Sequence, residues 1–524
     1  MRLKNTYRGL PKELYSDLLD RVWLGECDMD KLEKLIDKDL DSRSRDANLS
    51  KKGGVSTLLV NEDLAKDMGL DPKLLYSKDM ALVLTGKNKI KGTEPIAQAY
   101  MGHQFGYLNM LGDGRAILLG ELEVGDKLVD IQLKGSGRTI YSRGGDGKAS
   151  LGPMVREYLI SEAMAGLGIA TTRSLAICLT GEDVFRYKRE KGAVLTRIAD
   201  SHIRVGTFQF AEQTGGKDMV KDLADYSIKR HYRDILDDEN KSSSSNIYIE
   251  FFRRVLNRQA KLIADWMSVG FIHGVMNTDN MAISGQTIDY GPCAFMDTYR
   301  LDTVYSSIDK AGRYAYKNQP TIGAWNLSWL AHSLVDLFDQ NHEKGLNIAK
   351  KELEKFHLIF HSFWFDKLKK KIGIYGSEED DSRLLFELLT MLEKYEADYT
   401  NTFLAMTYDE LDYRELTGIK NLFESDEFKA WKDKLDSRRS LDIQKSRAKE
   451  NDYKNLMKQN NPVIIARNRL VEDIISGLEN GGDLSELIEL ASALKNPYEL
   501  NQVNIKLAKK DISTPLTYRT YCGT

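Results

Sequence analysis

The sequence lacks a strong net charge, a long apolar run and an apolar leader. Its 75 Lys and Arg residues nearly balance 78 Asp and Glu residues, and the resulting net charge of −3 provides no global basic field for nucleic acid. No stretch approaches the roughly 18 to 20 uninterrupted apolar residues of a membrane span. Residues 1–6 are not followed by the apolar run of a secretory signal. We therefore expect a cytoplasmic protein with no nucleic-acid partner and no membrane partner.

Cysteine is also scarce. The four cysteines, Cys27, Cys178, Cys293 and Cys522, are widely scattered, and no pair has the C-x-x-C spacing of zinc sites or redox motifs. Reduced structural thiols are therefore the default expectation. Hydrophobic residues make up 42% of the 524 residues, which is enough to bury one large core or two or three smaller ones.

Short apolar segments predict strands at residues 116–122 and, later, at 193–197, and residues 128–134 between them alternate apolar and polar as a half-buried strand does. In the second strand the alternation places Lys134 away from the most apolar face. The third strand ends on Arg197.

A helix is predicted after the second strand. It begins near Pro153, a favoured first-turn residue, and stops at Gly166, with Glu157 in its first turns. Glu157 follows Lys134 by 23 residues, and kinase folds use such a strand lysine and helix glutamate to hold phosphate oxygens. Alone, the pair is more simply interpreted as two surface residues, but the downstream loop favours the kinase interpretation.

That loop follows a long amphipathic helix that ends at Gly270. It reads His273-Gly274-Val275-Met276-Asn277-Thr278-Asp279-Asn280 and is followed by Asp289-Tyr290-Gly291. The kinase catalytic-loop pattern, H-R/G-D-x-x-x-x-N and then D-F-G, is matched at the histidine, the asparagine and the D-x-G. The aspartate that accepts the substrate proton is replaced by valine. The loop therefore belongs either to an inactive kinase fold or to an enzyme that performs other chemistry with nucleotide and metal.

Three oxygen-bearing residues of this region are candidate site residues. Asn280 and Asp289 are hard ligands suited to Mg²⁺ or Mn²⁺ that bridges phosphates, although both are also common in turns. Asp279 is either a loop acid or a displaced base that takes the role Val275 cannot perform. His357 and His361 are spaced i, i+4, but the apolar residues between them indicate a buried helix and not a metal site.

A glycine-rich segment and two arginines complete the candidate nucleotide site. The segment Gly112-Asp113-Gly114-Arg115 lacks the third glycine of G-x-G-x-x-G, but its N–H groups can cradle phosphate. Arg197 and Arg204 suit polyphosphate, although surface ion pairs are the commoner use of arginine. Gly147-Lys148-Ala149-Ser150 is not a P-loop, because a P-loop needs Ser or Thr at 149 and Gly at 142.

Residues 112–121, 130–172, 197–209 and 270–297 closely resemble the selenoprotein O family. The most specific signatures are Gln132-Leu133-Lys134-Gly135-Ser136-Gly137 and the loop from His273 to Asn280. The resemblance implies a pseudokinase fold that binds ATP flipped relative to a kinase. It also implies transfer of AMP to Ser, Thr or Tyr hydroxyls of proteins with release of pyrophosphate. Uridylylation with UTP and Mn²⁺ is implied for bacterial members.

The resemblance also assigns roles to individual residues. Lys134 holds phosphate and Glu157 orders it, Asp279 is the catalytic base, and Asn280 and Asp289 bind Mg²⁺ or Mn²⁺. The other implied nucleotide contacts are Gly112, Gly114, Arg115, Asp146, Gly147, Arg197 and Arg204, with Asp289 contacting the nucleotide as well. A flipped nucleotide also explains Val275, because the hydroxyl that attacks the α-phosphorus arrives in a different place.

Family members carry selenocysteine or cysteine near the C-terminus, where this chain has Cys522. Some bacterial members link it to a cysteine just after the D-x-G, where this chain has Cys293. Such a disulfide would tether the tail to the activation-loop region and could gate activity. Two free thiols, normal in a cytosol, are the alternative.

We therefore expect an α+β protein with a kinase-like, two-lobed fold. The expected parts are an N-terminal extension at 1–90, an N-lobe with the nucleotide-binding residues at 91–215, a C-lobe with the catalytic loop and metal site at 216–400, and a helical C-terminal extension at 401–524. The expected function is metal-dependent transfer of AMP from ATP to protein hydroxyls. Phosphoryl transfer with Asp279 as base, and a non-catalytic nucleotide-binding scaffold, are the alternatives.

Overall fold

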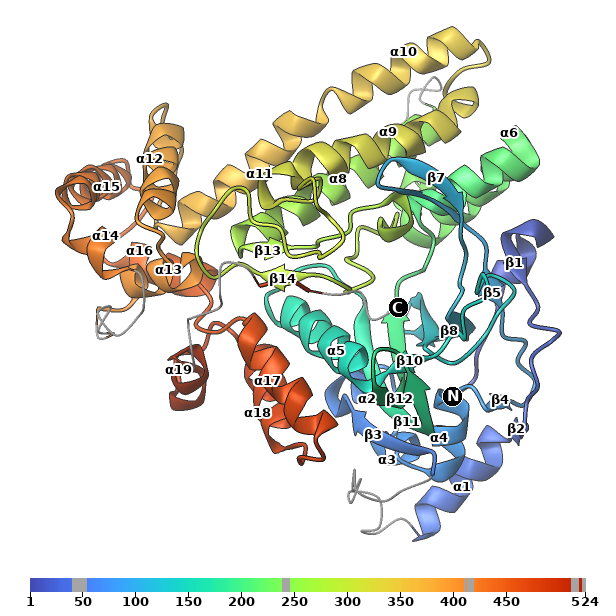
Figure 1. Ribbon diagram of the computed structural model, residues 1–524. Helices are drawn as coiled ribbons and strands as arrows, with labels where there is room; N and C mark the ends of the chain where they lie inside the picture. The colour runs from blue at the N-terminus through green and yellow to red at the C-terminus, as the bar shows by residue number, and fades with distance from the viewer. Residues whose placement is uncertain (40–53, 238–245, 410, 412–418, 510–517, 521–524) are drawn as a thin grey trace.

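The computed structural model describes residues 1–39, 54–237, 246–409, 411, 419–509 and 518–520 (Figure 1). The chain mixes helices and strands, in agreement with the expected α+β class. Apart from β13 (Phe271–Ile272) and β14 (Ala294–Phe295), the strands of the described residues precede residue 200, and the later part of the chain is largely helical.

One antiparallel sheet carries the two candidate cations Lys134 and Arg197. Its order is β3 (Ser56–Val60), β11 (Arg173–Phe185), β12 (Arg189–Ala199), β9 (Lys127–Lys134) and β8 (Ala116–Val124), and β10 (Ala149–Ser150) pairs with β12. The register sets Gln132 opposite Arg197 and Lys134 opposite Leu195. The three predicted strands are therefore present, each somewhat longer than expected.

Both faces of this sheet are buried. Ile131 and Leu133 of β9 pack in a core shared with helices α2 (Glu62–Asp67), α3 (Pro72–Leu75) and α4 (Lys78–Leu84). Ile177 and Leu195 belong to the larger core on the other face, together with α5 (Leu151–Gly166). Lys134 therefore points away from the face of Ile131 and Leu133, as the alternation predicted.

Helix α5 begins two residues before Pro153 and ends at Gly166, as expected from the sequence. Helices α17 (Asn468–Glu479) and α18 (Ser485–Lys495) pack against it (Figure 1). A β-carbon on Gly152 would meet the side chains of Glu479 and Ile475, and one on Gly166 would meet the backbone of Leu494. These two glycines allow the C-terminal helices to approach closely the helix that carries Glu157.

Helix α8 (Ile247–Ser268) leads directly into β13 and the His273 loop, as predicted. The hairpin of β6 (Met101–Gln104) and β7 (Tyr107–Met110) lies against α6 (Val205–His231) and the loop that contains Asp279. Further helices are α9 (Gln319–Phe338), α10 (His342–Leu353), α11 (Phe356–Lys371), α12 (Asp381–Lys394), α13 (Tyr399–Thr407), α14 (Lys420–Glu424), α15 (Asp426–Gln444), α16 (Asp452–Asn460) and α19 (Gln502–Lys509).

Across the described ranges, every helix is too short or too polar to cross a membrane. The domain boundaries at residues 90, 215 and 400 stay a prediction.

Candidate active site

Four charged side chains form a buried network where β9, β12 and α5 meet the Asp289 loop. Lys134 Nζ lies 2.6 Å from Glu157 Oε2 and 3.4 Å from Asp289 Oδ1. Arg197 Nε lies 2.5 Å from Glu157 Oε1, and its Nη2 lies 2.5 Å from Asp289 Oδ1. Burial alone would raise the pKa of Asp289, but Arg197, Lys134 and Arg204 outweigh it and hold the pKa well below the usual range. The predicted Lys134–Glu157 pair is thus formed, and Arg197 joins it.

Arg204 extends the network from the start of α6. Its Nη2 lies 3.3 Å from Asp289 Oδ2, and its Nη1 lies 3.5 Å from Asp113 Oδ1. Its guanidinium is 4.2 Å from the ring centroid of Tyr100. Three cations therefore surround the Asp289 carboxylate, with Glu157 and Asp113 as further counter-ions, and such a cluster of lysine and arginine suits an incoming polyphosphate.

The loop residues Asn280 and Asp289 suit a divalent cation. Asn280 Nδ2 donates a hydrogen bond to the Val275 carbonyl at 3.0 Å, which leaves its amide oxygen as a ligand. Asp289 has a left-handed backbone, with φ of 62°, and His273 Nε2 bonds the preceding carbonyl, of Ile288, at 2.9 Å. The described residues contain no group of three or more His, Cys, Asp or Glu side chains that could hold a metal ion. Two protein oxygens completed by phosphates and water fit this donor set.

Asp279 lies in a short 3₁₀ turn, Thr278–Asn280, and is 9% exposed. Its Oδ1 is buried and finds no hydrogen-bond partner within the described ranges. Burial raises the pKa of Asp279 to about 7. A carboxyl group that titrates near neutrality is a suitable proton acceptor, whereas the neighbouring Val275 is not.

The glycine-rich segment and the Asp146 loop form the opposite wall. Gly112 has φ of 102°, and a β-carbon there would overlap the ring of Tyr141, while Gly114 approaches the Tyr141 carbonyl. Gly147 packs against the backbone of Gly137 with φ of 66°. Glycine is therefore required by close approach at these positions, as well as by backbone conformation at two of them.

One cavity of about 470 Å³ brings nearly all of the predicted residues together. Glu157 is the exception, since it contacts Lys134 but lines a second cavity of about 1070 Å³ and not the first. The predicted residues that line the first cavity are Gly112, Gly114, Arg115, Lys134, Asp146, Gly147, Arg197, Arg204, Asp279, Asn280 and Asp289, and Val275 lines it too.

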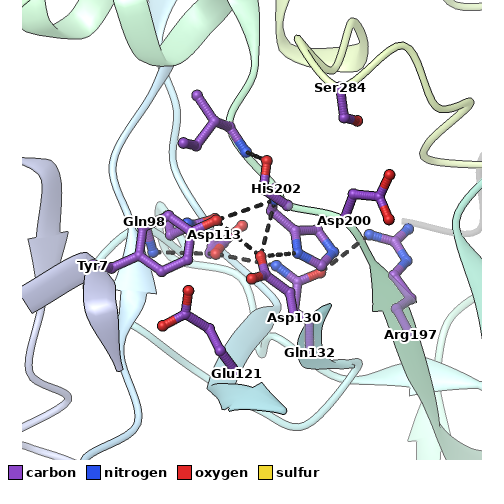
Figure 2. A network of polar contacts seen from close by, with 12 residues as sticks. Tyr7, Gln98, Asp113, Glu121, Asp130, Gln132, Arg197, Asp200, His202 and Ser284 are labelled. Carbon is purple, nitrogen blue, oxygen red and sulfur yellow. Dashed lines mark hydrogen bonds and ion pairs between the residues drawn. The ribbon is translucent and has the colours of Figure 1, made fainter. Parts of the chain in front are cut away.

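Sequence reasoning missed Asp113 and Gln132, which connect the arginines to the sheet (Figure 2). Asp113 accepts hydrogen bonds from Gln132 Nε2 at 3.3 Å and from the Gln98 N–H at 3.1 Å. Gln132 Oε1 in turn accepts from Arg197 Nη1 at 3.3 Å. The available signals were the position of Asp113 between two glycines and the alternation that puts Gln132 on the face of Lys134.

Two other predictions have different outcomes. His357 and His361 lie on α11, but both are exposed, so the expectation that they mark a buried helix is wrong at these positions.

Cys293 is buried, whereas Cys522 lies outside the described residues. The Cys293–Cys522 pairing therefore stays a prediction.

Comparison with known proteins identifies the family. A sequence model described as "Protein adenylyltransferase SelO" matches residues 45–495. The chain belongs to the SelO family. It is 51% identical over 480 residues to a "Protein nucleotidyltransferase YdiU" of Clostridium perfringens, covering 90% of this chain and 94% of the relative.

A YdiU protein of Clostridium botulinum is 46% identical over 526 residues, with 100% of this chain and 98% of the relative covered. One of Bacillus mycoides is 50% identical over 466 residues, with 89% of this chain and 92% of the relative covered. The resemblance drawn from the sequence is confirmed, and this SelO-family chain is an enzyme of the nucleotidyltransferase class.

Proposed function

We propose that this SelO-family enzyme transfers AMP from ATP to Ser, Thr or Tyr hydroxyls of proteins in the cytoplasm, on a two-lobed, kinase-like (pseudokinase) fold. The observation that carries the proposal is Asp279. Its buried carboxyl group, with a free Oδ1, shares one cavity with Lys134, Arg197, Arg204 and Asp289. The kinase base position in the same cavity is Val275, which argues against ordinary γ-phosphoryl transfer.

The cations supply the binding energy for the polyphosphate. Lys134, Arg197 and Arg204 are held in place by Glu157 and Asp289, so little ordering is needed when phosphate oxygens arrive. Gly112, Gly114 and Arg115, together with Asp146 and Gly147, form one wall of the nucleotide cavity. A bound Mg²⁺ or Mn²⁺, held by Asn280 and Asp289, would neutralise phosphate charge.

The reaction requires one proton acceptor and one leaving group. Asp279 accepts the proton of the acceptor hydroxyl while that oxygen forms a bond to the α-phosphorus of ATP. The bond from the α-phosphorus to the bridging α,β-oxygen breaks, and its electron pair leaves with pyrophosphate. Lys134 and the two arginines stabilise the negative charge on the departing group.

Labelled nucleotide distinguishes the proposal from its alternatives. ATP labelled at the α-phosphate should leave label on protein, whereas ATP labelled at the γ-phosphate should not. Label retained from the γ-position would establish phosphoryl transfer instead, and no transfer from either would favour a non-catalytic scaffold. Parallel reactions with UTP and Mn²⁺ test uridylylation, and mass spectrometry identifies the modified side chain.

A further inference from the structure

Arg186 lies at the tip of the hairpin between β11 and β12, and a planar set of contacts fixes its guanidinium. Its Nη1 lies 2.9 Å from Asp146 Oδ2, and its Nη2 lies 3.0 Å from Asp146 Oδ1. Nη2 also donates to the Lys148 carbonyl at 3.0 Å, and Nη1 to the Phe185 carbonyl at 3.0 Å. Since these acceptors occupy the edge of the guanidinium, its flat faces are what remains for a ligand.

Arg186 lines both cavities of the site. Its hydrogen bond to the Lys148 carbonyl places the guanidinium beside Ala149, which pairs with Ala193 of β12. Ala193 precedes Arg197 by four residues, and a strand rises about 3.3 Å per residue, so Ala193 and Arg197 are about 13 Å apart along it. Arg186 therefore lines the same cavity as Lys134, Arg197 and Arg204, at a separation that one nucleoside triphosphate can span.

The segment that joins β12 to α6 offers no room for a nucleobase. It contains Ser201, His202 and Ile203, which are all buried and do not line the cavity. The His202 N–H donates to Asp130 Oδ2 at 2.9 Å, and the Ile203 N–H donates to Ser201 Oγ at 3.4 Å (Figure 2). Backbone donors that could recognise a base there are already used within the protein.

We propose that the nucleobase of the bound nucleoside triphosphate stacks on the guanidinium of Arg186. This inference rests on the proposed function, because it takes a nucleotide with its phosphates at Lys134, Arg197 and Arg204. Arginine stacks well on aromatic faces because its guanidinium is planar and weakly hydrated. A purine overlaps this plane more than a pyrimidine does, so Arg186 also favours ATP over UTP.

Binding measurements separate the base from the phosphates. The probes are α,β-methylene-ATP, α,β-methylene-UTP and inorganic tripolyphosphate, each titrated by calorimetry with Mg²⁺. Arg186→Ala should weaken binding of the ATP analogue on the order of tenfold, as the loss of one stacking contact implies. It should weaken binding of the UTP analogue less and leave the affinity for tripolyphosphate unchanged.

Arg186→Lys tests whether the plane or the charge matters. An ammonium keeps the positive charge but offers no flat face, so this variant should bind the ATP analogue as weakly as Arg186→Ala. Arg189→Ala is the matched control, because Arg189 pairs with Asp183 on the same hairpin and lines neither cavity. It should bind all three probes like the wild type.

Several outcomes would overturn the stacking proposal. If Arg186→Ala weakened tripolyphosphate binding as much as binding of the ATP analogue, Arg186 would be a phosphate contact. Wild-type binding of the ATP analogue by Arg186→Lys would show that only the positive charge matters. Wild-type binding of the ATP analogue by Arg186→Ala would remove Arg186 from the site. Lys134→Ala shows separately whether the proposed function fails. If this variant bound tripolyphosphate as tightly as the wild type, the phosphate site itself would be refuted.

Discussion

Gly102 of strand β6 lies directly against the carboxylate of Asp279. A β-carbon on Gly102 would overlap Oδ1 and Cγ of Asp279, while a β-carbon on Gly206 would overlap the Met101 carbonyl and touch the Cα of Asp279. The β6–β7 hairpin is in turn fixed to the helical part by His103, whose ring stacks on Trp329 at 4.0 Å between centroids. The burial that raises the pKa of Asp279 is therefore created by segments distant in the sequence.

Gly102→Ala should lower kcat/KM for AMP transfer by on the order of 100-fold, because a shift of about 1 Å in a reacting group can have this effect. Thermal unfolding should show that the fold remains intact. Gly9→Ala is the control, since no atom lies within 4 Å of the position of its added β-carbon. Equal rates for the wild type and Gly102→Ala would mean that the contact with Asp279 is not needed.

Asp279 predicts the pH dependence of the reaction. Burial raises its pKa to about 7, so the proton-accepting carboxylate is the minor form below that pH. The value of kcat/KM, which reports the free enzyme, should rise about tenfold per pH unit below about 7 and level off above it. Asp279→Asn should abolish transfer while α,β-methylene-ATP still binds. An ascending limb centred near pH 4 would contradict the assignment.

Asp289→Asn should separate catalysis from phosphate binding. It removes a metal ligand, so transfer should be lost. It also removes the carboxylate shared by Lys134, Arg197 and Arg204, so these cations become freer for another anion. Metal-free binding of tripolyphosphate, measured by calorimetry, should therefore tighten by roughly tenfold. Transfer at the wild-type rate would refute the metal site, and weaker tripolyphosphate binding would refute the shared counter-ion.

Lys371, which lies outside the active site, makes the free energy of unfolding depend on pH. Burial lowers the pKa of Lys371 to about 7, below the value of about 10.4 for an unfolded lysine. Between these values the unfolded chain binds the additional proton, so raising the pH should stabilise the fold by up to about 1.4 kcal/mol per pH unit. The rings of Phe403 and Tyr399, at 4.5 and 5.6 Å, favour the charged form and so narrow the pH range over which this slope applies.

The test compares urea unfolding at pH 7 and pH 9. Lys371→Met lacks the titrating group, so its free energy of unfolding should rise less with pH than that of the wild type. Lys370→Met is the matched control, because Lys370 is only half-buried and pairs with Asp366. Parallel pH dependences for the wild type and Lys371→Met would show that Lys371 is not the group responsible.

Local sequence pattern predicted the elements around the site well. Period-two alternation located β9, short apolar segments located β8 and β12, and Pro153 and Gly166 nearly bounded α5, because these signals act within a few residues. Asp113, Gln132 and Arg186 were missed, because their partners lie on other elements and no local pattern records such pairing.

The sequence by itself determined the family, the order of the elements around the site and many of the residues that line the cavity. Motif and spacing were sufficient for these, since they are properties of the chain read in order. Tertiary structure alone decided that Arg197 joins the Lys134–Glu157 pair, that Gly102 buries Asp279, and that Arg186 lines the same cavity as both. These relationships depend on strand register and on the docking of a hairpin, which bring distant residues within hydrogen-bonding or van der Waals distance.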